Sequence, residues 1–222
     1  MKAFASTLIL LFGFTLSISS QQLKENGTAV TEIVPEGWSF EVANGDLNKD
    51  GRLDMVILTY PNFSEHLKVR DDGYVYNFNQ PLLAIYFREP SGNYHLWKSY
   101  DNVVPARENE YISIDATLNI TLRGTLEIGI SEFSSAGSWQ TSSSKYTFRY
   151  QNEDFFLIGK DEECMSRNSG ERTIVSENYL THKQQRITDN VFDDKVKRKE
   201  KWSKLERRPL QRMGEKTLAV EY

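Results

Sequence analysis

Ten short runs rich in β-branched and aromatic residues follow one another along this chain of 222 residues, and turn residues separate them. Helical periodicity is scarce, and Gly, Asn and Pro mark the connections as hairpins. The pattern predicts one all-β domain built as an antiparallel meander. The expected strands are residues 38–43, 53–60, 81–87, 94–100, 112–118, 125–133, 145–151, 154–160, 173–179 and 183–188.

The apolar pattern differs among these runs. Residues 55–58, 82–87 and 155–158 are nearly continuous in apolar side chains, which is typical of central strands covered on both faces. Residues 145–151 alternate between aromatic and polar side chains, which indicates a strand with one exposed face. The longest expected loops are residues 61–80 and 134–144, both polar with embedded aromatics.

The first 20 residues have the features of a secretory signal peptide. Lys2 provides a charged start, residues 8–16 are apolar, and small residues follow at Ser17, Ser19 and Ser20. The mature chain is therefore expected to be exported, to the periplasm or the extracellular space. No apolar stretch reaches the roughly 20 residues of a membrane-spanning helix, so no transmembrane segment is expected in the mature chain.

A single cysteine and an uneven charge distribution bound the remaining possibilities. Cys164 is the only cysteine, so an intramolecular disulfide is excluded, and an exported chain without disulfides often depends on a metal.

Residues 194–216 hold ten Lys or Arg against four acids, which is a charge of +6, whereas the whole chain carries −4. We therefore divide the mature chain into a β domain, residues 21–192, and a basic C-terminal segment, residues 193–222. This segment is either a solvated element at an edge of the domain or a binder of polyanions through residues 195–216. Within it, Trp202 and Leu205 fit one helical face.

The stretch DLNKDGRLD, residues 46–54, places oxygen-bearing side chains at alternating positions around one glycine. Gly51 allows the sharp turn that brings such oxygens together, and Ca²⁺ prefers several hard oxygen ligands in a flexible loop. Position 12 of an EF-hand needs a Glu, but Ile57 stands there, inside an expected strand. The alternative is an ordinary polar turn. We predict a calcium site in which Lys49 and the Arg52 side chain point to solvent, with ligands from the side chains of Asp46, Asn48, Asp50 and Asp54 and the backbone carbonyl of Arg52.

The sequence DLNKDGRLDMVIL resembles the calcium loop and following strand of FG-GAP and VCBS repeats, the blade unit of integrin alpha-chain propellers. Residues 81–97 are similar to the hairpin that follows such a loop, and the second half of the chain resembles small exported bacterial proteins with a single loop. The resemblance implies calcium-supported β-structure in a surface or binding protein. Because a propeller needs several blades and one loop is present, we expect blade-like units and not a complete propeller.

The sequence assigns no catalytic residue. It contains neither the HExxH motif of zinc proteases nor the GxSxG motif of serine hydrolases. We therefore favour a non-catalytic module that binds a protein or a glycan, with no specific nucleic-acid partner. The alternative enzyme is a glycan hydrolase using carboxylates among Glu108, Glu110 and Asp115.

Aromatic side chains could stack on the sugar rings of a glycan. The aromatics considered are Trp97, Trp139, Tyr146 and Tyr150. Core packing is expected for most of them. Trp139 is the exception, because it stands in an expected Ser-rich loop.

Overall fold

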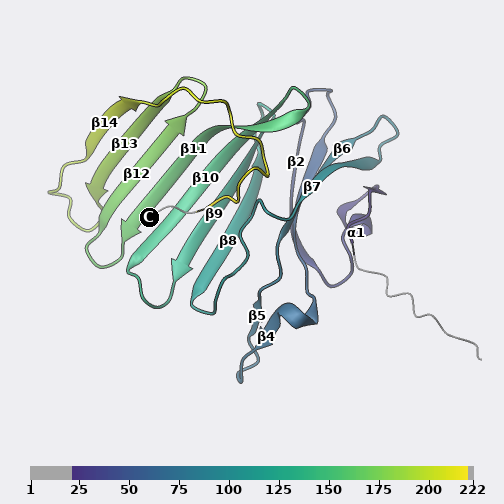
Figure 1. The fold of residues 1–222 in the computed structure, drawn as a ribbon, viewed down its shortest axis with the longest axis horizontal. Helices are drawn as coiled ribbons and strands as arrows, with labels where there is room; N and C mark the ends of the chain where they lie inside the picture. Colours follow the sequence, from purple (N-terminus) through teal and green to yellow (C-terminus); the bar gives the residue numbers. More distant parts are fainter. Residues whose placement is uncertain (1–21, 220–222) are drawn as a thin grey trace, which may run out of the picture.

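The computed structural model describes residues 22–219, so the predicted signal peptide lies outside the described residues. Two large antiparallel sheets make up nearly all of the fold (Figure 1). The predicted all-β meander without a closed propeller is confirmed.

The N-terminal sheet has five strands in the order β1-β7-β6-β3-β2. Their bounds are β1 Asn26–Gly27, β2 Ser39–Gly45, β3 Asp54–Tyr60, β6 Leu82–Arg88 and β7 Tyr94–Tyr100. Strands β3 and β6 are buried on both faces, as their continuous apolar runs predict. On β3, Val56 and Leu58 face one core, whereas Met55 and Ile57 face a second core under the short helix α1 (Val30–Ile33).

The C-terminal sheet is a meander of seven strands in which every strand pairs with its sequence neighbours. Leu126, Ile128 and Ile130 of its strand β9 point into the larger core, and the residues between them point to the other face. The strands are β8 Ile112–Ile120, β9 Thr125–Ser134, β10 Gln140–Gln151, β11 Asp154–Ser166, β12 Glu171–Asn178, β13 Lys183–Asn190 and β14 Lys199–Lys204.

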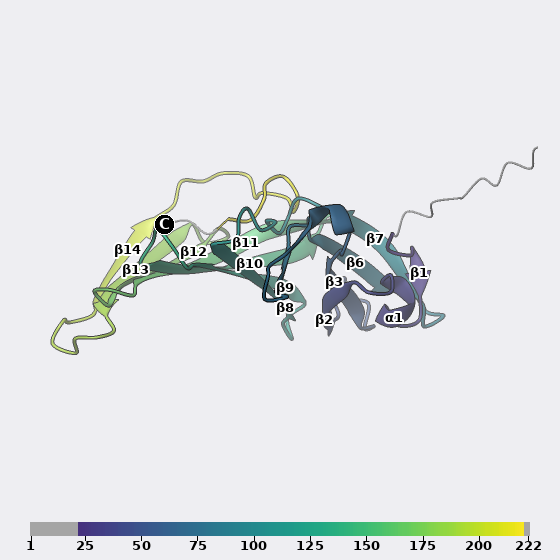
Figure 2. The same ribbon diagram turned by 90° about the horizontal axis from the view of Figure 1, so that it is seen from below.

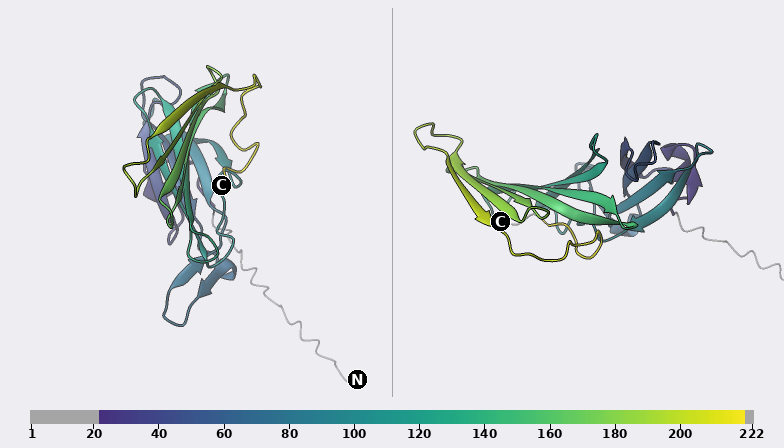
Figure 3. Two further views of the ribbon diagram at one scale, coloured as in Figure 1. Left: turned by 90° about the vertical axis from the view of Figure 1, so that its left-hand side faces the viewer. Right: turned by 90° about the horizontal axis from the view of Figure 1, so that it is seen from above.

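The two sheets follow one arch when they are viewed edge-on (Figure 2). They meet where β2 contacts β8, and Ile120 packs against Gly45, where a Cβ atom would collide with it. Residues 205–219, which we call the C-terminal strap, run back from β14 along the side of the arch opposite α1 (Figures 2 and 3). Met213 and Leu218 of the strap are buried in the larger core.

Three segments differ from the sequence-based expectation. Residues 140–144, expected in a loop, begin β10, where all five pair with β11 and residues 141–144 also pair with β9. Residues 61–80 are not a plain loop, because they hold the 3-10 turn η1 (Ser64–His66) and a hairpin of β4 (Leu67–Val69) and β5 (Val75–Asn77). Residues 199–204 form no helical face: they are β14, whose backbone pairs with β13 at the sheet edge.

Candidate metal site

The loop that we predicted to bind calcium joins β2 to β3 at one edge of the arch. Gly51 adopts a φ of 83°, a left-handed conformation that favours glycine, and Lys49 shares it with a φ of 64°. The loop packs against the turn between β8 and β9, where a Cβ atom on Gly124 would collide with the Asp46 carbonyl oxygen. A tight backbone contact therefore holds the base of the loop.

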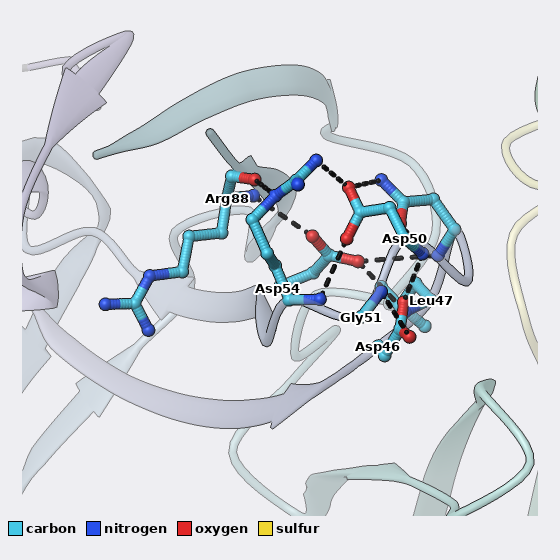
Figure 4. Close-up of polar contacts among 8 residues, drawn as sticks. Asp46, Leu47, Asp50, Gly51, Asp54 and Arg88 are labelled. Atoms are coloured by element: carbon cyan, nitrogen blue, oxygen red, sulfur yellow. Dashed lines mark hydrogen bonds and ion pairs between the residues drawn. The ribbon is translucent and has the colours of Figure 1, made fainter. Parts of the chain in front are cut away.

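Asp46 and Asn48 act as hydrogen-bond acceptors inside the loop, and Figure 4 shows the bonds of Asp46. The Asp46 carboxylate accepts the Asp50 N–H at 3.1 Å and the Gly51 N–H at 3.0 Å. The Asn48 side-chain oxygen also accepts the Asp50 N–H, at 3.1 Å. The backbone is thus wrapped around the oxygens of these two side chains.

Asp54 is the buried member of the set, with no exposed surface. Its Oδ2 accepts the Leu47 N–H at 2.9 Å, and its Oδ1 accepts the Arg88 N–H from the end of β6 at 3.0 Å. A third, longer bond of 3.4 Å comes from the Asn48 N–H. Burial raises the pKa of Asp54 despite these bonds, and Asp54 forms no ion pair with any residue that the structure describes. The site therefore holds a buried carboxylate that is bound by backbone N–H groups and by no ion pair within the described residues.

The side chain of Arg52 remains 39% exposed, but it is not free in solvent. Its guanidinium pairs with the Asp50 carboxylate, and its Nε donates to the Arg88 carbonyl oxygen at 2.7 Å. Asp50 is thereby turned toward Arg52. Within residues 22–219, no three or more His, Cys, Asp or Glu side chains converge as a group able to hold a metal ion.

The carboxylates of the alternative hydrolase do not gather in one place. Glu110 forms an ion pair with Lys68. Glu108 lies near Glu132, whose pKa is raised by burial and, to a smaller extent, by Glu108. In the register, Glu132 stands opposite Ile114, and Asp115 projects from the other face of β8 because successive strand residues alternate.

Three of the four aromatics considered for sugar stacking are packing residues. Trp97 and Tyr150 belong to an aromatic cluster with Phe87 and Phe155. Tyr146 is buried, and its hydroxyl bonds to the backbone of Ala219. Trp139 is 66% exposed, in the loop that follows β9.

A polar groove, which the sequence analysis missed, lies across the C-terminal sheet on the face away from the strap. Lys145 is at its centre, 3.1 Å from Asp161 and 3.8 Å from Glu127. The available signal was the alternation within the expected strands, which sets these polar residues on one face. The side chains lining the groove include those of Thr117, Asn119, Glu127, Ser131, Ser143, Lys145, Asp161 and Glu163.

These features define an antiparallel all-β protein with a carboxylate-rich loop between two paired strands. Residues 40–78, which contain this loop and the strands around it, match the family model of the FG-GAP repeat. This part of the chain is therefore similar to an FG-GAP repeat. The comparisons with curated proteins and with solved structures each returned no match. Within the described part of the chain, no helix has the length and apolar character needed to cross a membrane.

Proposed function

We propose that this chain is an exported, non-catalytic interaction module whose β-scaffold is supported by calcium and binds a protein or a glycan. The FG-GAP match over residues 40–78 carries the proposal, because FG-GAP repeats belong to interaction modules and generally bind calcium. The match covers the whole DLNKDGRLD loop.

The donor set of the loop fits calcium chemically. Asp54 is a buried carboxylate that forms no ion pair within residues 22–219, and Asp46 directs both of its oxygens into the loop. Calcium would supply the positive charge that these carboxylates lack. To bind the ion, the Asp50 carboxylate has to release the Arg52 guanidinium. The guanidinium of Arg52 therefore competes with calcium for this carboxylate. The proposed ligands are the side chains of Asp46, Asn48, Asp50 and Asp54 and the Arg52 carbonyl.

Calcium is expected to raise the melting temperature of the purified protein. Extracellular calcium loops bind with dissociation constants of about 10⁻⁴ to 10⁻³ M. Free calcium at about ten times that constant adds roughly 1.4 kcal/mol to the free energy of unfolding, which is about 3–6 °C for a chain of this size. Differential scanning calorimetry with calcium, magnesium and chelator measures the shift, and magnesium is expected to give less.

Two substitutions separate a calcium site from an ordinary turn. Asp50→Ala should abolish the calcium-dependent shift. Arg52→Ala should preserve or enlarge it, because the carbonyl remains while the competing guanidinium is removed. Arg123→Ala, an exposed arginine on the neighbouring turn, is the matched control. Identical melting in calcium and chelator for all of these proteins would identify the loop as a turn only.

The same shift should shrink in acid. The folded-state pKa of Asp54 is raised, so its carboxylate takes up a proton at a higher pH than in the unfolded chain. The rise in melting temperature caused by calcium is therefore complete at a pH above the raised pKa of Asp54. It is lost as the pH falls through that pKa.

The polar groove is the surface to which we assign the ligand. Its hydroxyl, amide and carboxylate groups can each hydrogen-bond to sugar hydroxyls or to an extended peptide. Glycan arrays and pull-downs from native exterior fractions, in calcium and in chelator, test the assignment. We expect a retained ligand whose binding falls about tenfold in Asp161→Ala but not in the exposed control Asp71→Ala. Turnover of a glycan substrate that is lost in Asp115→Asn would overturn the non-catalytic assignment.

A further inference from the structure

Exposed apolar side chains gather along one edge of the C-terminal sheet. In this meander β9, β11 and β13 end at the edge from which β10, β12 and β14 start, so their three connecting loops lie in a row (lower edge of the sheet in Figure 1). Trp139 is 66% and Phe192 64% exposed. We call this surface the loop edge, and its exposed apolar residues are Phe133, Trp139, Val191, Phe192 and Val196.

Phe192 is held in its exposed position by the backbone around it. The Asn190 side-chain oxygen accepts the N–H groups of Phe192 at 2.8 Å and Asp193 at 3.0 Å. The Val191 N–H donates to the Gly170 carbonyl at 2.8 Å, and the Phe192 ring covers Gly170, where a Cβ atom would strike it. The loop therefore presents one ring face outward on a defined turn.

Trp139 and Phe133 are fixed in a similar way by Arg167. Its guanidinium lies 4.5 Å from the Phe133 ring centre and 5.9 Å from that of Trp139. The same group donates to the carbonyls of Ser134 at 2.9 Å and Ser138 at 2.8 Å. The first and the third of the three loops thus each hold an exposed aromatic side chain in place.

Cations outnumber acids beside the apolar tips, where Asp193 and Asp194 are the acids of the loop and Arg198 lies near enough to Asp189 and Glu200 to lower the pKa of both. The loop between β13 and β14 and the first residue of β14 carry Lys195, Lys197, Arg198 and Lys199, and none of these forms an ion pair within the described residues. The pairing of β13 with β14 also sets like charges directly opposite each other, Arg186 with Lys201 in the middle of the hairpin and Lys183 with Lys204 at its far end, away from the loop edge. Such pairs destabilise a sheet unless an anion relieves them.

We propose that the loop edge docks on the surface of an anionic lipid bilayer. The Trp, Phe and Val side chains enter the boundary between headgroups and acyl chains, and the neighbouring lysines and arginines contact the lipid phosphates. A sugar chain is the poorer occupant, because Phe192 and Val196 offer no hydrogen-bonding group. The calcium loop lies at the opposite edge, beside the turn between β8 and β9, so this inference does not depend on the proposed function.

Vesicle co-sedimentation of the purified protein tests this docking. We expect binding to phosphatidylcholine vesicles that contain phosphatidylglycerol, in calcium and in chelator, with weaker binding to phosphatidylcholine alone. Phe192→Ala and Trp139→Ala should each weaken the partition about tenfold. Leu122→Ala, which removes a fully exposed leucine from the opposite edge, should leave it unchanged.

The charge component is tested separately. Lys195→Glu combined with Lys197→Glu should reduce binding at least tenfold and weaken its salt dependence, whereas Arg123→Glu at the opposite edge should not. Unchanged melting curves show that the variants are folded. Three results overturn the proposal: no vesicle binding, binding that Phe192→Ala leaves intact, or retention only on a soluble sulfated polysaccharide. A dimer that Phe192→Ala converts to monomer in sedimentation velocity assigns the edge to a second copy of the chain and also overturns it.

Discussion

Asp54→Ala is expected to lower the free energy of unfolding by about 3 kcal/mol, and to do so in chelator as well as in calcium. The carboxylate accepts the N–H groups of Leu47, Asn48 and Arg88, and the alanine leaves these donors without an acceptor in a buried place. Each unsatisfied buried donor costs about 1–3 kcal/mol. The melting temperature should fall by about 6–12 °C for a chain of this size. Thermal and urea unfolding measure both quantities.

Asp50→Ala is the matched control, since it removes a carboxylate from the same loop. Asp50 is partly exposed, and its ion pair with Arg52 is at the surface, so its loss in chelator should cost less than about 0.5 kcal/mol. We therefore expect Asp54 to stabilise the fold with or without a metal. Asp50 should affect only the gain in stability that calcium provides. Equal losses in chelator for the two variants contradict this division.

Leu218→Ala is expected to cost about 3 kcal/mol, although Leu218 lies in a segment that reads as a polar, basic tail. Its side chain is 4% exposed within the larger core, and its N–H donates to the Val103 carbonyl at 2.9 Å. Truncating a buried leucine removes its burial energy and leaves a cavity, with costs of about 2–5 kcal/mol.

Leu122→Ala makes the same truncation at a fully exposed position and should change stability by less than about 0.5 kcal/mol. Urea unfolding of the two variants compares them directly. If both behave as the wild type does, the strap contributes nothing to the core in solution.

The local sequence predicted most of the strands, because a strand buried on both faces needs a continuous apolar run. Residues 55–58 form such a run, and all four are buried in β3. Alternation in residues 145–151 likewise matches the inward Tyr146 and Phe148 of β10. The residue types of the candidate metal site could be predicted in the same way, since its oxygens lie within nine consecutive residues.

The start of β10 and the whole of β14 could not be predicted from side-chain pattern. Ser142 and Ser144 are buried, yet serine is common in loops, and only pairing with β9 and β11 makes them strand residues. Every residue of β14 is exposed, so no apolar periodicity marks it. Its strand conformation comes from backbone hydrogen bonds to β13. These bonds do not depend on which side chains the strand carries.

The sequence by itself determined the antiparallel all-β class, most strand positions and the oxygen-rich loop, because these depend on neighbouring residues. Only the tertiary structure decided that Asp54 bonds to Arg88 from a different strand, and that Arg52 turns back onto Asp50. It also brought Trp139 and Phe192 to one edge, although 52 residues separate them along the chain. The physical reason is that a meander returns its loops to the same edge at every second turn, and burial then selects contacts that no local pattern records.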